Sequence, residues 1–180
     1  MVGVARGGVA VAVEVARKLA APLTAVDVER VNARGLRVGA VTAQGPPYLR
    51  AGHGVPDEEV ESALAGARRA AEVLEARLEL TPVPVAARTT VLVDDGLITG
   101  LTLAAACRWA RAWRAARVIA ATPVAHVDGL ARLRAEADVV VCPHPLQEIA
   151  VVGQAYDIFD GLDEWYVAGL LADAPGDASK

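Results

Sequence analysis

Residues 90–102 read T-V-L-V-D-D-G-L-I-T-G-L-T. The run begins with β-branched and apolar residues, which predict a buried β-strand. Two adjacent carboxylates, Asp94 and Asp95, follow directly, and a loop with glycines leads from them into a predicted helix. This order of strand, loop and helix is typical of an anion site, because the first backbone N–H groups of a helix have no partner within it.

Each part of this loop suits a sugar phosphate. Thr99 and Thr102 add hydroxyl donors to the backbone N–H groups, and Gly96 and Gly100 let the backbone approach a phosphate closely. The two carboxylates would repel a bare phosphate, but they can accept hydrogen bonds from vicinal hydroxyls or face a divalent cation. A phosphate beside a pair of hydroxyls describes a ribose 5-phosphate.

The beginning of the chain has a second loop of this kind. The apolar run Val2–Ala5 predicts a strand, residues 6–8 (Arg-Gly-Gly) predict a turn, and residues 9–19 have helical spacing. The planar guanidinium of Arg6 matches the oxygen atoms of a phosphate. We therefore interpret residues 6–8 as a second phosphate loop.

The rest of the chain continues to alternate strands with helices. Further strands are expected at residues 23–28, 38–42, 89–93, 117–121 and 139–142, and helices at residues 57–78, 102–114, 128–135 and 163–171. This alternation predicts an α/β fold with a mostly parallel twisted sheet and helices on both faces. Because parallel strands end at one edge, both loops are expected to line one pocket. We assign residues 1–171 to a single domain and expect residues 172–180 to form a disordered tail.

Composition narrows the class of protein. Hydrophobic residues make up 54% of the 180 residues but aromatic residues only 4%, as expected for a Val-rich sheet under Ala-rich helices. The formal net charge of -4 argues against nucleic acid or an anionic membrane as a partner.

No apolar run is long enough to cross a bilayer and no secretory signal is recognised, so we expect a cytoplasmic protein. Cys107 and Cys142 lie far apart and are interpreted as buried apolar residues, and the histidines lack the spacing of a zinc site.

Residues 91–102 resemble the signature with which type I phosphoribosyltransferases bind phosphoribosyl pyrophosphate (PRPP). The signature has apolar residues, two acidic residues and a loop ending in Thr-Gly-x-Thr. The resemblance implies that Asp94 and Asp95 hold the ribose 2- and 3-hydroxyls and that residues 97–102 surround the 5-phosphate. Residues 5–8 are similar to the pyrophosphate loop of that family. The implied ligand-binding residues are Arg6, Gly7, Gly8, Asp94, Asp95, Gly96, Leu97, Ile98, Thr99, Gly100, Leu101 and Thr102.

The same resemblance implies magnesium as a cofactor. Asp94 and Asp95 are its implied ligands and, together with Arg6, the implied catalytic residues. A looser resemblance covers most of the chain and relates it to a bacterial group described only as predicted phosphoribosyltransferases. That group has the Arg-Gly-Gly loop, an Arg-rich helical segment and a late V-G-x-x-Y-x-x-F stretch, here residues 152–159. It implies a small C-terminal hood segment over the pocket.

The sequence also departs from the family pattern. Ile98 precedes Thr99, where 6-oxopurine enzymes carry an Asp thought to act as a general base. Leu101 replaces a usual glycine, and Glu29-Arg30 stands where related members have Arg-Lys. A 6-oxopurine acceptor is therefore disfavoured.

Three functions are compatible with these features. An enzyme would use PRPP and magnesium to transfer ribose 5-phosphate to a nitrogenous acceptor and release pyrophosphate. The alternative is a non-catalytic module that senses PRPP or a nucleotide, which the departures at Ile98 and Leu101 favour. An RNA-binding regulator is disfavoured by the acidic charge. A homodimer is the common expectation for such folds.

A few other side chains are candidates for ligand contacts. His144 follows the last predicted strand, and we favour a plain loop residue over an acceptor contact. We expect Trp165 and Tyr166 to anchor a short terminal helix to the core. Residues 43–57, including Tyr48, predict a mobile loop that either closes over PRPP or is a disordered surface loop.

Overall fold

The computed structural model of the protein describes residues 1–4, 6–80 and 85–174. Its strands are β1 (Val2–Val4), β2 (Thr24–Val26), β3 (Glu29–Ala33), β4 (Leu36–Val41), β5 (Tyr48–Leu49), β6 (Thr89–Val93), β7 (Arg117–Ala121), β8 (Val124–His126), β9 (Val139–Val141) and β10 (His144–Leu146). Its helices are α1 (Gly7–Leu19), α2 (Asp57–Arg77), α3 (Leu101–Ala112), α4 (Val127–Leu133), the 3-10 helix η1 (Val152–Ala155) and α5 (Glu164–Ala172). Across these described residues, no helix is both long and apolar enough to cross a bilayer.

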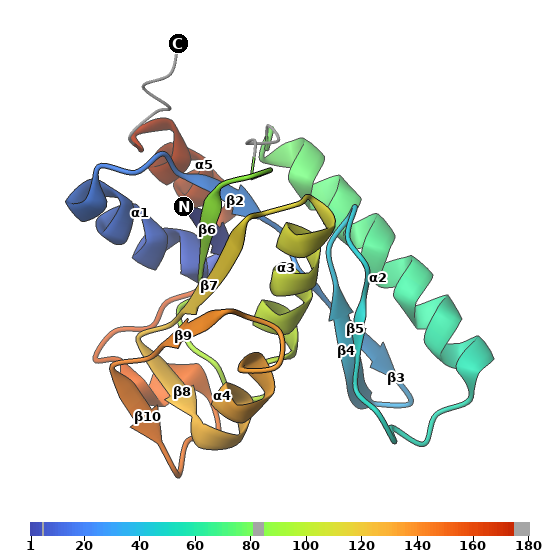
Figure 1. Ribbon diagram of the computed structural model, residues 1–180. Coiled ribbons are helices and arrows are strands. Elements are labelled where there is room, and N and C mark those ends of the chain that lie inside the picture. Colours follow the sequence, from blue (N-terminus) through green and yellow to red (C-terminus); the bar gives the residue numbers. More distant parts are fainter. Residues whose placement is uncertain (5, 81–84, 175–180) are drawn as a thin grey trace.

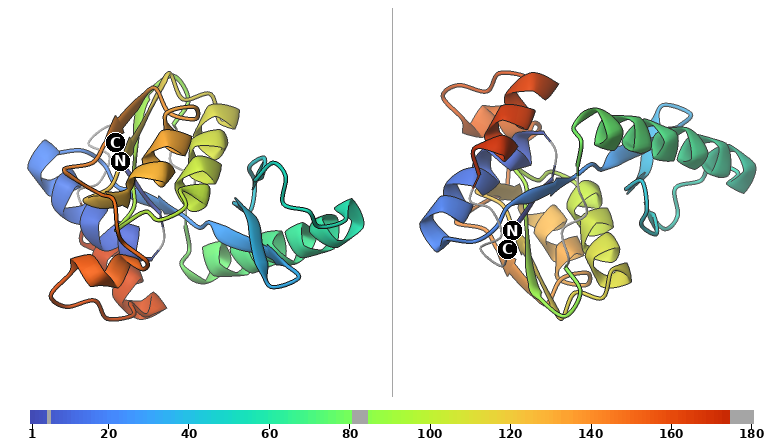
Figure 2. Two further views of the ribbon diagram at one scale, coloured as in Figure 1. Left: turned by 90° about the horizontal axis from the view of Figure 1, so that it is seen from below. Right: turned by 90° about the horizontal axis from the view of Figure 1, so that it is seen from above.

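Five strands form one parallel sheet in the order β2-β1-β6-β7-β9. Helix α1 packs on one face with α5 against it, and α3 packs on the other face with α4 beside it (Figures 1 and 2). The predicted α/β architecture, a mostly parallel sheet with helices on both faces, is confirmed. Both faces of a parallel sheet are covered by helices, and the strands of this sheet are accordingly rich in valine and other apolar residues.

The core of this sheet is built from small and medium-sized apolar side chains. Val2, Leu92 and Val118 are buried in the strands, and residues 103–107 of α3 form a continuous buried run against them. Because this run consists mainly of alanine, the helix axis can lie close to the sheet. Cys107 belongs to the run and is fully buried, and Cys142 packs against the same core.

A second, antiparallel sheet has the strand order β3-β4-β5. Together with α2 it extends to one side of the five-stranded sheet (Figure 2). The helix predicted at residues 57–78 is confirmed by α2, on which Val60, Ala71 and Leu74 are buried. The sequence analysis missed β3, because polar residues alternate with its inward residues Val31 and Ala33 and no continuous apolar run marks the strand. The predicted mobile loop at residues 43–57 contains β5, which pairs with β4.

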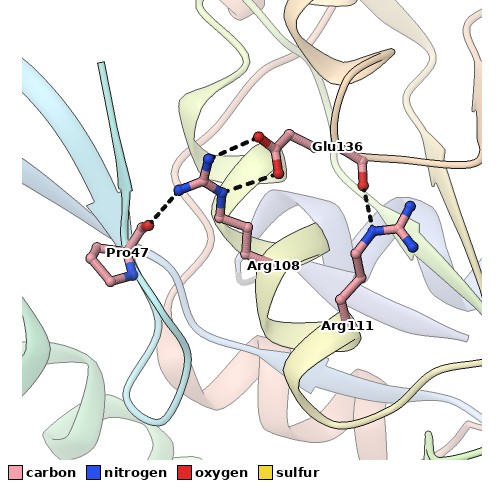
Figure 3. Close-up of polar contacts among 4 residues, drawn as sticks. All are labelled: Pro47, Arg108, Arg111 and Glu136. Atoms are coloured by element: carbon pink, nitrogen blue, oxygen red, sulfur yellow. Dashed lines mark hydrogen bonds and ion pairs between the residues drawn. The ribbon is translucent and has the colours of Figure 1, made fainter. Parts of the chain in front are cut away.

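Arg108 of α3 joins this second sheet to the core (Figure 3). Its guanidinium donates to the carbonyl oxygen of Pro47 at 2.9 Å and to both carboxylate oxygens of Glu136 at 3.0 and 2.9 Å. The same guanidinium lies over the ring of Tyr48, 4.5 Å from its centroid. Tyr48 is therefore held against α3 by packing and by a cation–π contact.

Beyond the ends of β7 and β9, the chain forms another parallel pair, β8 with β10. The sequence analysis missed both strands, because Pro123 and Pro145 interrupt the apolar pattern that indicates a strand. Leu97 pairs with Ala125 of β8 in an isolated parallel bridge. This pair of strands therefore supports the loop that follows β6.

The expected role of Trp165 and Tyr166 in α5 is wrong. These side chains are 86% and 55% exposed, whereas Val167 is fully buried against α1 and α2. The helix turns its small and aliphatic residues inward because α1 lies close beneath it. The helix ends at Ala172, one residue beyond the predicted boundary, and residues 175–180 lie outside the described residues.

Candidate functional site

The two predicted phosphate loops follow strands that lie side by side. In the parallel pair of β1 and β6, Val2 is opposite Leu92 and Gly3 is opposite Val93. Both strands therefore end at the same edge of the sheet, where α/β folds of this kind bind ligands. The predicted convergence of the two loops is confirmed by this register, although Ala5 itself lies outside the described residues.

Two glycines allow the loops to touch. A Cβ atom on Gly7 would lie 2.0 Å from Oδ2 of Asp95, and a Cβ atom on Gly8 would lie 2.5 Å from the carbonyl oxygen of Val93. Side chains at these positions would separate the loops, so the glycines are required by close approach. The first turn of α1 consequently begins beside the two carboxylates.

The loop after β6 is fixed by backbone hydrogen bonds to its neighbours. The Asp94 N–H donates to Ala121 at 3.1 Å, and the Leu97 N–H donates to Val124 at 3.1 Å. Gly100 has a φ of +74°, in the left-handed region that favours glycine, and it directly precedes α3. The loop thus enters the N-terminus of α3 in one defined conformation.

Helix α4 supports the same loop from outside. Gly129 lies so close that a Cβ atom there would be 2.5 Å from the carbonyl oxygen of Ile98. One residue further along the loop, the carbonyl oxygen of Thr99 accepts a hydrogen bond from the guanidinium of Arg132. The sequence analysis missed both contacts, since nothing in the sequence places α4 next to residues 97–100.

A cavity of about 1120 Å³ lies between the loops and the segment from 150 to 162. Ten of the predicted ligand-binding residues line it: Arg6, Gly7, Asp94, Asp95, Gly96, Leu97, Ile98, Thr99, Gly100 and Thr102. Gly8 and Leu101 are not among its lining residues. Leu101 is buried in the core, so its bulk does not narrow the space for a phosphate.

The acid pair is the most strongly perturbed part of the cavity. Burial raises the pKa of Asp94 well above its usual range, and the adjacent negative charge of Asp95 raises it further. Burial also raises the pKa of Asp95. The Asp95 N–H donates to Oδ1 of Asp94 at 3.0 Å, and the hydroxyl of Thr102 donates to Oδ2 at 3.5 Å. Ligands that donate hydrogen bonds or carry positive charge would stabilise the ionised form of these two carboxyl groups.

Two arginines from the second sheet face the same cavity. Arg30 of β3 and Arg37 of β4 line it together with Arg6. Burial lowers the pKa of Arg37, and the neighbouring cation of Arg30 lowers it further. The charge of Arg30 also acts on Asp95. Glu29, which the sequence analysis treated as a reversal of charge in the site, lines a smaller neighbouring cavity instead.

The sequence analysis missed Arg37. The local sequence is a weak indicator that Arg37 belongs to the site. The residue comes next to Arg30 only through the register of the β3–β4 hairpin, in which Arg37 is opposite Asn32.

The predicted hood closes one side of the cavity. The hydroxyl of Tyr156 donates a hydrogen bond to the carbonyl oxygen of Asp95. Gly96 lies against Val152, where a Cβ atom would be 2.3 Å from Cγ1. These contacts fix η1 and the residues around it directly over the acid pair.

A family model of the phosphoribosyl transferase domain matches residues 1–158. The chain belongs to the phosphoribosyl transferase domain family. Two Mycobacterium tuberculosis proteins, from strains CDC 1551 and H37Rv, are 33% identical to the chain over an alignment of 190 positions. Each of them carries the name of an inferred phosphoribosyl transferase. The match includes 100% of this chain, and the chain spans 43% of the length of these relatives.

Two solved structures are similar to the chain in fold. A Thermus thermophilus protein is 32% identical, with a TM-score of 0.82 over 97% of this chain and 87% of that one. An Aquifex aeolicus protein, 16% identical with a TM-score of 0.50 over 82% of this chain and 55% of that one, shares the fold alone.

Other candidates from the sequence lie outside the cavity of this phosphoribosyl transferase domain. His144 is exposed in β10, and Tyr48 packs on α3. Trp165 and Tyr166 are not among the lining residues either. His144 does not line the cavity, in agreement with the preference against an acceptor contact, but it belongs to a strand and not to a loop as expected.

The acid pair has the type and number of ligand groups that a magnesium ion bound together with a phosphate compound would require. Among the described residues, no group of three or more His, Cys, Asp or Glu side chains is arranged to hold a metal. Magnesium is commonly bound by one or two carboxylates together with water and substrate phosphates. Asp94 and Asp95 supply that number of carboxylates, and the three arginines that line the cavity suit the phosphates.

Proposed function

We propose that the chain is a phosphoribosyltransferase that uses PRPP and magnesium to transfer ribose 5-phosphate to a nitrogenous acceptor, with release of pyrophosphate. The observation that carries the proposal is the contact between the two loops at Gly7 and Asp95. It brings two helix N-termini, an acid pair and three arginines to one cavity. A molecule with two separate phosphate groups on a sugar matches this set of groups.

Each part of PRPP has a counterpart among these residues. The 5-phosphate would lie on the backbone N–H groups of residues 97–102 at the start of α3, where the helix dipole favours negative charge. The carboxylates of Asp94 and Asp95 would accept hydrogen bonds from the 2- and 3-hydroxyls. The pyrophosphate would lie on the first turn of α1 between Arg6, Arg30 and Arg37, which line the cavity.

These residues would assist transfer by position and charge. Guanidinium groups around the pyrophosphate would stabilise the negative charge that grows as the C1′–O bond breaks. The acid pair would hold the ribose so that C1′ faces the hood and the acceptor. Magnesium, when bound, would neutralise part of the charge of the pyrophosphate oxygens.

Calorimetric titration with PRPP and magnesium tests the proposal. Removal of both carboxylates in Asp94→Asn/Asp95→Asn is expected to weaken PRPP binding by roughly 100-fold or more, because two charge-assisted hydrogen bonds are lost and each contributes about 1.5–3 kcal/mol. A matched control is Asp57→Asn/Glu58→Gln, which removes two exposed carboxylates from the first turn of α2. Unchanged PRPP affinity in the Asp94/Asp95 variant would contradict the proposal.

A second measurement separates catalysis from sensing. Pyrophosphate release is measured with PRPP, magnesium and a panel of nitrogen bases. Release that requires both PRPP and one of the bases is the expected result. PRPP binding without release across the panel would favour the non-catalytic sensing module.

A further inference from the structure

The carbonyl oxygens of the loop after β6 are bonded to elements on the outer side of the loop. The carbonyl of Leu97 accepts a hydrogen bond from the N–H of His126, at the end of β8, at 2.8 Å. The carbonyl of Gly100 accepts one from the N–H of Ala104, in the first turn of α3, at 3.0 Å. Helix α4, which contacts both β8 and α3 (Figure 1), lies against the same loop through Gly129.

The N–H groups of this loop are free by contrast. Among the described residues, no acceptor is bonded to the N–H groups of residues 98–101. In a trans peptide the C=O and N–H bonds point in opposite directions, so a carbonyl held on the outer side turns the next N–H inward. Ile98, Thr99 and Gly100 line the cavity. The direction of the carbonyls therefore decides which N–H groups can meet a phosphate.

The carbonyl of Thr99 differs from its neighbours because its partner is a side chain. It accepts a hydrogen bond from the guanidinium of Arg132, in the last turn of α4. A charged donor makes a stronger hydrogen bond than a neutral N–H group. It also polarises the peptide between Thr99 and Gly100, which makes the Gly100 N–H a better donor.

This peptide is also the one with the most freedom to turn over. Gly100 has a φ of +74°, but glycine adopts negative φ about as readily. A second orientation of the Thr99–Gly100 peptide is therefore open to the chain, with the carbonyl oxygen of Thr99 directed toward the cavity. An oxygen atom in that position would repel a phosphate. The bond from Arg132 stabilises the orientation that presents the N–H group instead.

We propose that Arg132 is a positioning residue for the 5-phosphate: it holds the Thr99 carbonyl on the outer side of the loop and thereby presents the Gly100 N–H to the ligand. The inference rests on the proposed function. Arg132 is not among the residues that line the cavity, so it acts through the backbone and not by contact with the ligand.

Calorimetry of the full chain with two separate ligands tests this role. Arg132→Met is expected to weaken the binding of ribose 5-phosphate about tenfold. It should leave the binding of pyrophosphate with magnesium unchanged, because that ligand is expected on the first turn of α1. The control is Arg134→Met, which removes the same charge from an exposed residue at the end of α4 and should change neither affinity. Equal weakening of both ligands in Arg132→Met would overturn the inference.

Two further measurements separate positioning from general support of the fold. Arg132→Lys keeps a charged donor and is expected to recover part of the affinity for ribose 5-phosphate. In the wild type, saturation with ribose 5-phosphate is expected to move the Gly100 amide proton downfield in the NMR spectrum, and in Arg132→Met the shift should be smaller. The same shift in both proteins would overturn the inference, whatever the stability of the variant.

The wild-type titrations distinguish this inference from the proposed function. If neither ribose 5-phosphate nor PRPP binds to the wild type, the proposed function is wrong and the inference falls with it. If both bind, and Arg132→Met binds ribose 5-phosphate as tightly as the wild type, the proposed function stands and the role of Arg132 is wrong.

Discussion

Gly7 lies at the contact between the two loops, and nothing larger fits there without movement. A Cβ atom at this position would be 2.0 Å from Oδ2 of Asp95. Gly66 of α2 offers the opposite environment, because a Cβ atom there meets no other atom within 4 Å. The two positions therefore form a matched pair for testing close approach.

Gly7→Ala is expected to displace the carboxylate of Asp95 and weaken PRPP binding by about tenfold or more, equivalent to about 1.4 kcal/mol. Gly66→Ala is expected to leave PRPP binding unchanged and to stabilise the protein by roughly 0.5–1 kcal/mol, because alanine favours helix. Calorimetry and thermal unfolding of both variants give the two quantities. Wild-type affinity in Gly7→Ala would show that the loops are not held in register by this contact.

Asp27 is a buried acid outside the cavity lining. It is 3% exposed, and its Oδ2 atom has no hydrogen-bond partner. Burial raises its pKa to about 7, with a further contribution from the negative charges of Glu29 and Glu75. The folded state therefore keeps a proton that the unfolded state releases near pH 4. The free energy of unfolding falls as the pH rises through the window between these two values.

Asp27→Asn removes this dependence, because asparagine does not ionise. Relative to the wild type, the variant is expected to gain about 2 kcal/mol of unfolding free energy between pH 5.5 and pH 8.5. Urea unfolding at the two pH values measures the difference. A constant difference between variant and wild type would mean that Asp27 is already ionised in the folded protein at pH 5.5.

At the scale of elements, Arg108 connects α3, the segment before β5 and the residues after α4. Its hydrogen-bond partners Pro47 and Glu136 are 61 and 28 residues away from it in the sequence, and Tyr48 follows Pro47 directly. The side chain of Glu136 is only 16% exposed, so loss of the guanidinium leaves a carboxylate with little access to water. Arg111, one turn further along α3, makes comparable bonds to the Glu136 carbonyl and to Asp138, but in an exposed position (Figure 3).

Arg108→Met is expected to lower the free energy of unfolding by about 2 kcal/mol, because it leaves a partly buried acceptor unpaired. Arg111→Met is expected to cost about 1 kcal/mol or less, as for exposed ion pairs. Urea unfolding of the two variants compares them directly. Equal losses would indicate that Arg108 does not hold the second sheet against α3.

At the scale of the whole molecule, the cavity is assembled from three regions. The five-stranded sheet supplies the two loops, the β3–β4 hairpin supplies Arg30 and Arg37, and the segment from 150 to 162 supplies the cover. None of these regions contains a complete site. A ligand that contacts all of them should therefore reduce their local opening together.

PRPP with magnesium is expected to slow backbone hydrogen exchange in three separate segments: residues 6–12, residues 94–104 and residues 150–156. At a ligand concentration of about 100 times Kd, binding adds about 2.7 kcal/mol to the free energy of unfolding. Amides that exchange by global opening should therefore exchange roughly 100-fold more slowly. Exchange measured by mass spectrometry should show little local change in the exposed first turns of α2. Slowing restricted to one of the two loops would contradict a shared ligand.

The order of residues along the chain was enough to predict the five-stranded sheet, the helices around it and the two loops at its edge. The alternation of apolar runs with helical stripes is a local signal, and residues 90–102 contain a strand, an acid pair and a helix start within one short segment. Strand β3 and the pair β8–β10 were missed for the same reason, since polar residues and prolines hide their local pattern. The exposed aromatic pair in α5 was misjudged because the sequence does not tell which face of a short helix meets α1.

The side chains that complete the cavity could be identified only once the packing of the elements was known. Arg37 reaches the cavity through the register of the β3–β4 hairpin, and Tyr156 and Phe159 reach it because the segment from 150 to 162 folds back over the acid pair. The raised pKa of Asp27 likewise arises only through burial in the folded protein. Gly7 and Asp95 are separated by about half of the chain, yet their contact sets the distance between the two loops. Contacts of this kind depend on how the elements pack on one another. The free energy that favours this packing comes from contacts throughout the core and not from any single segment of the sequence.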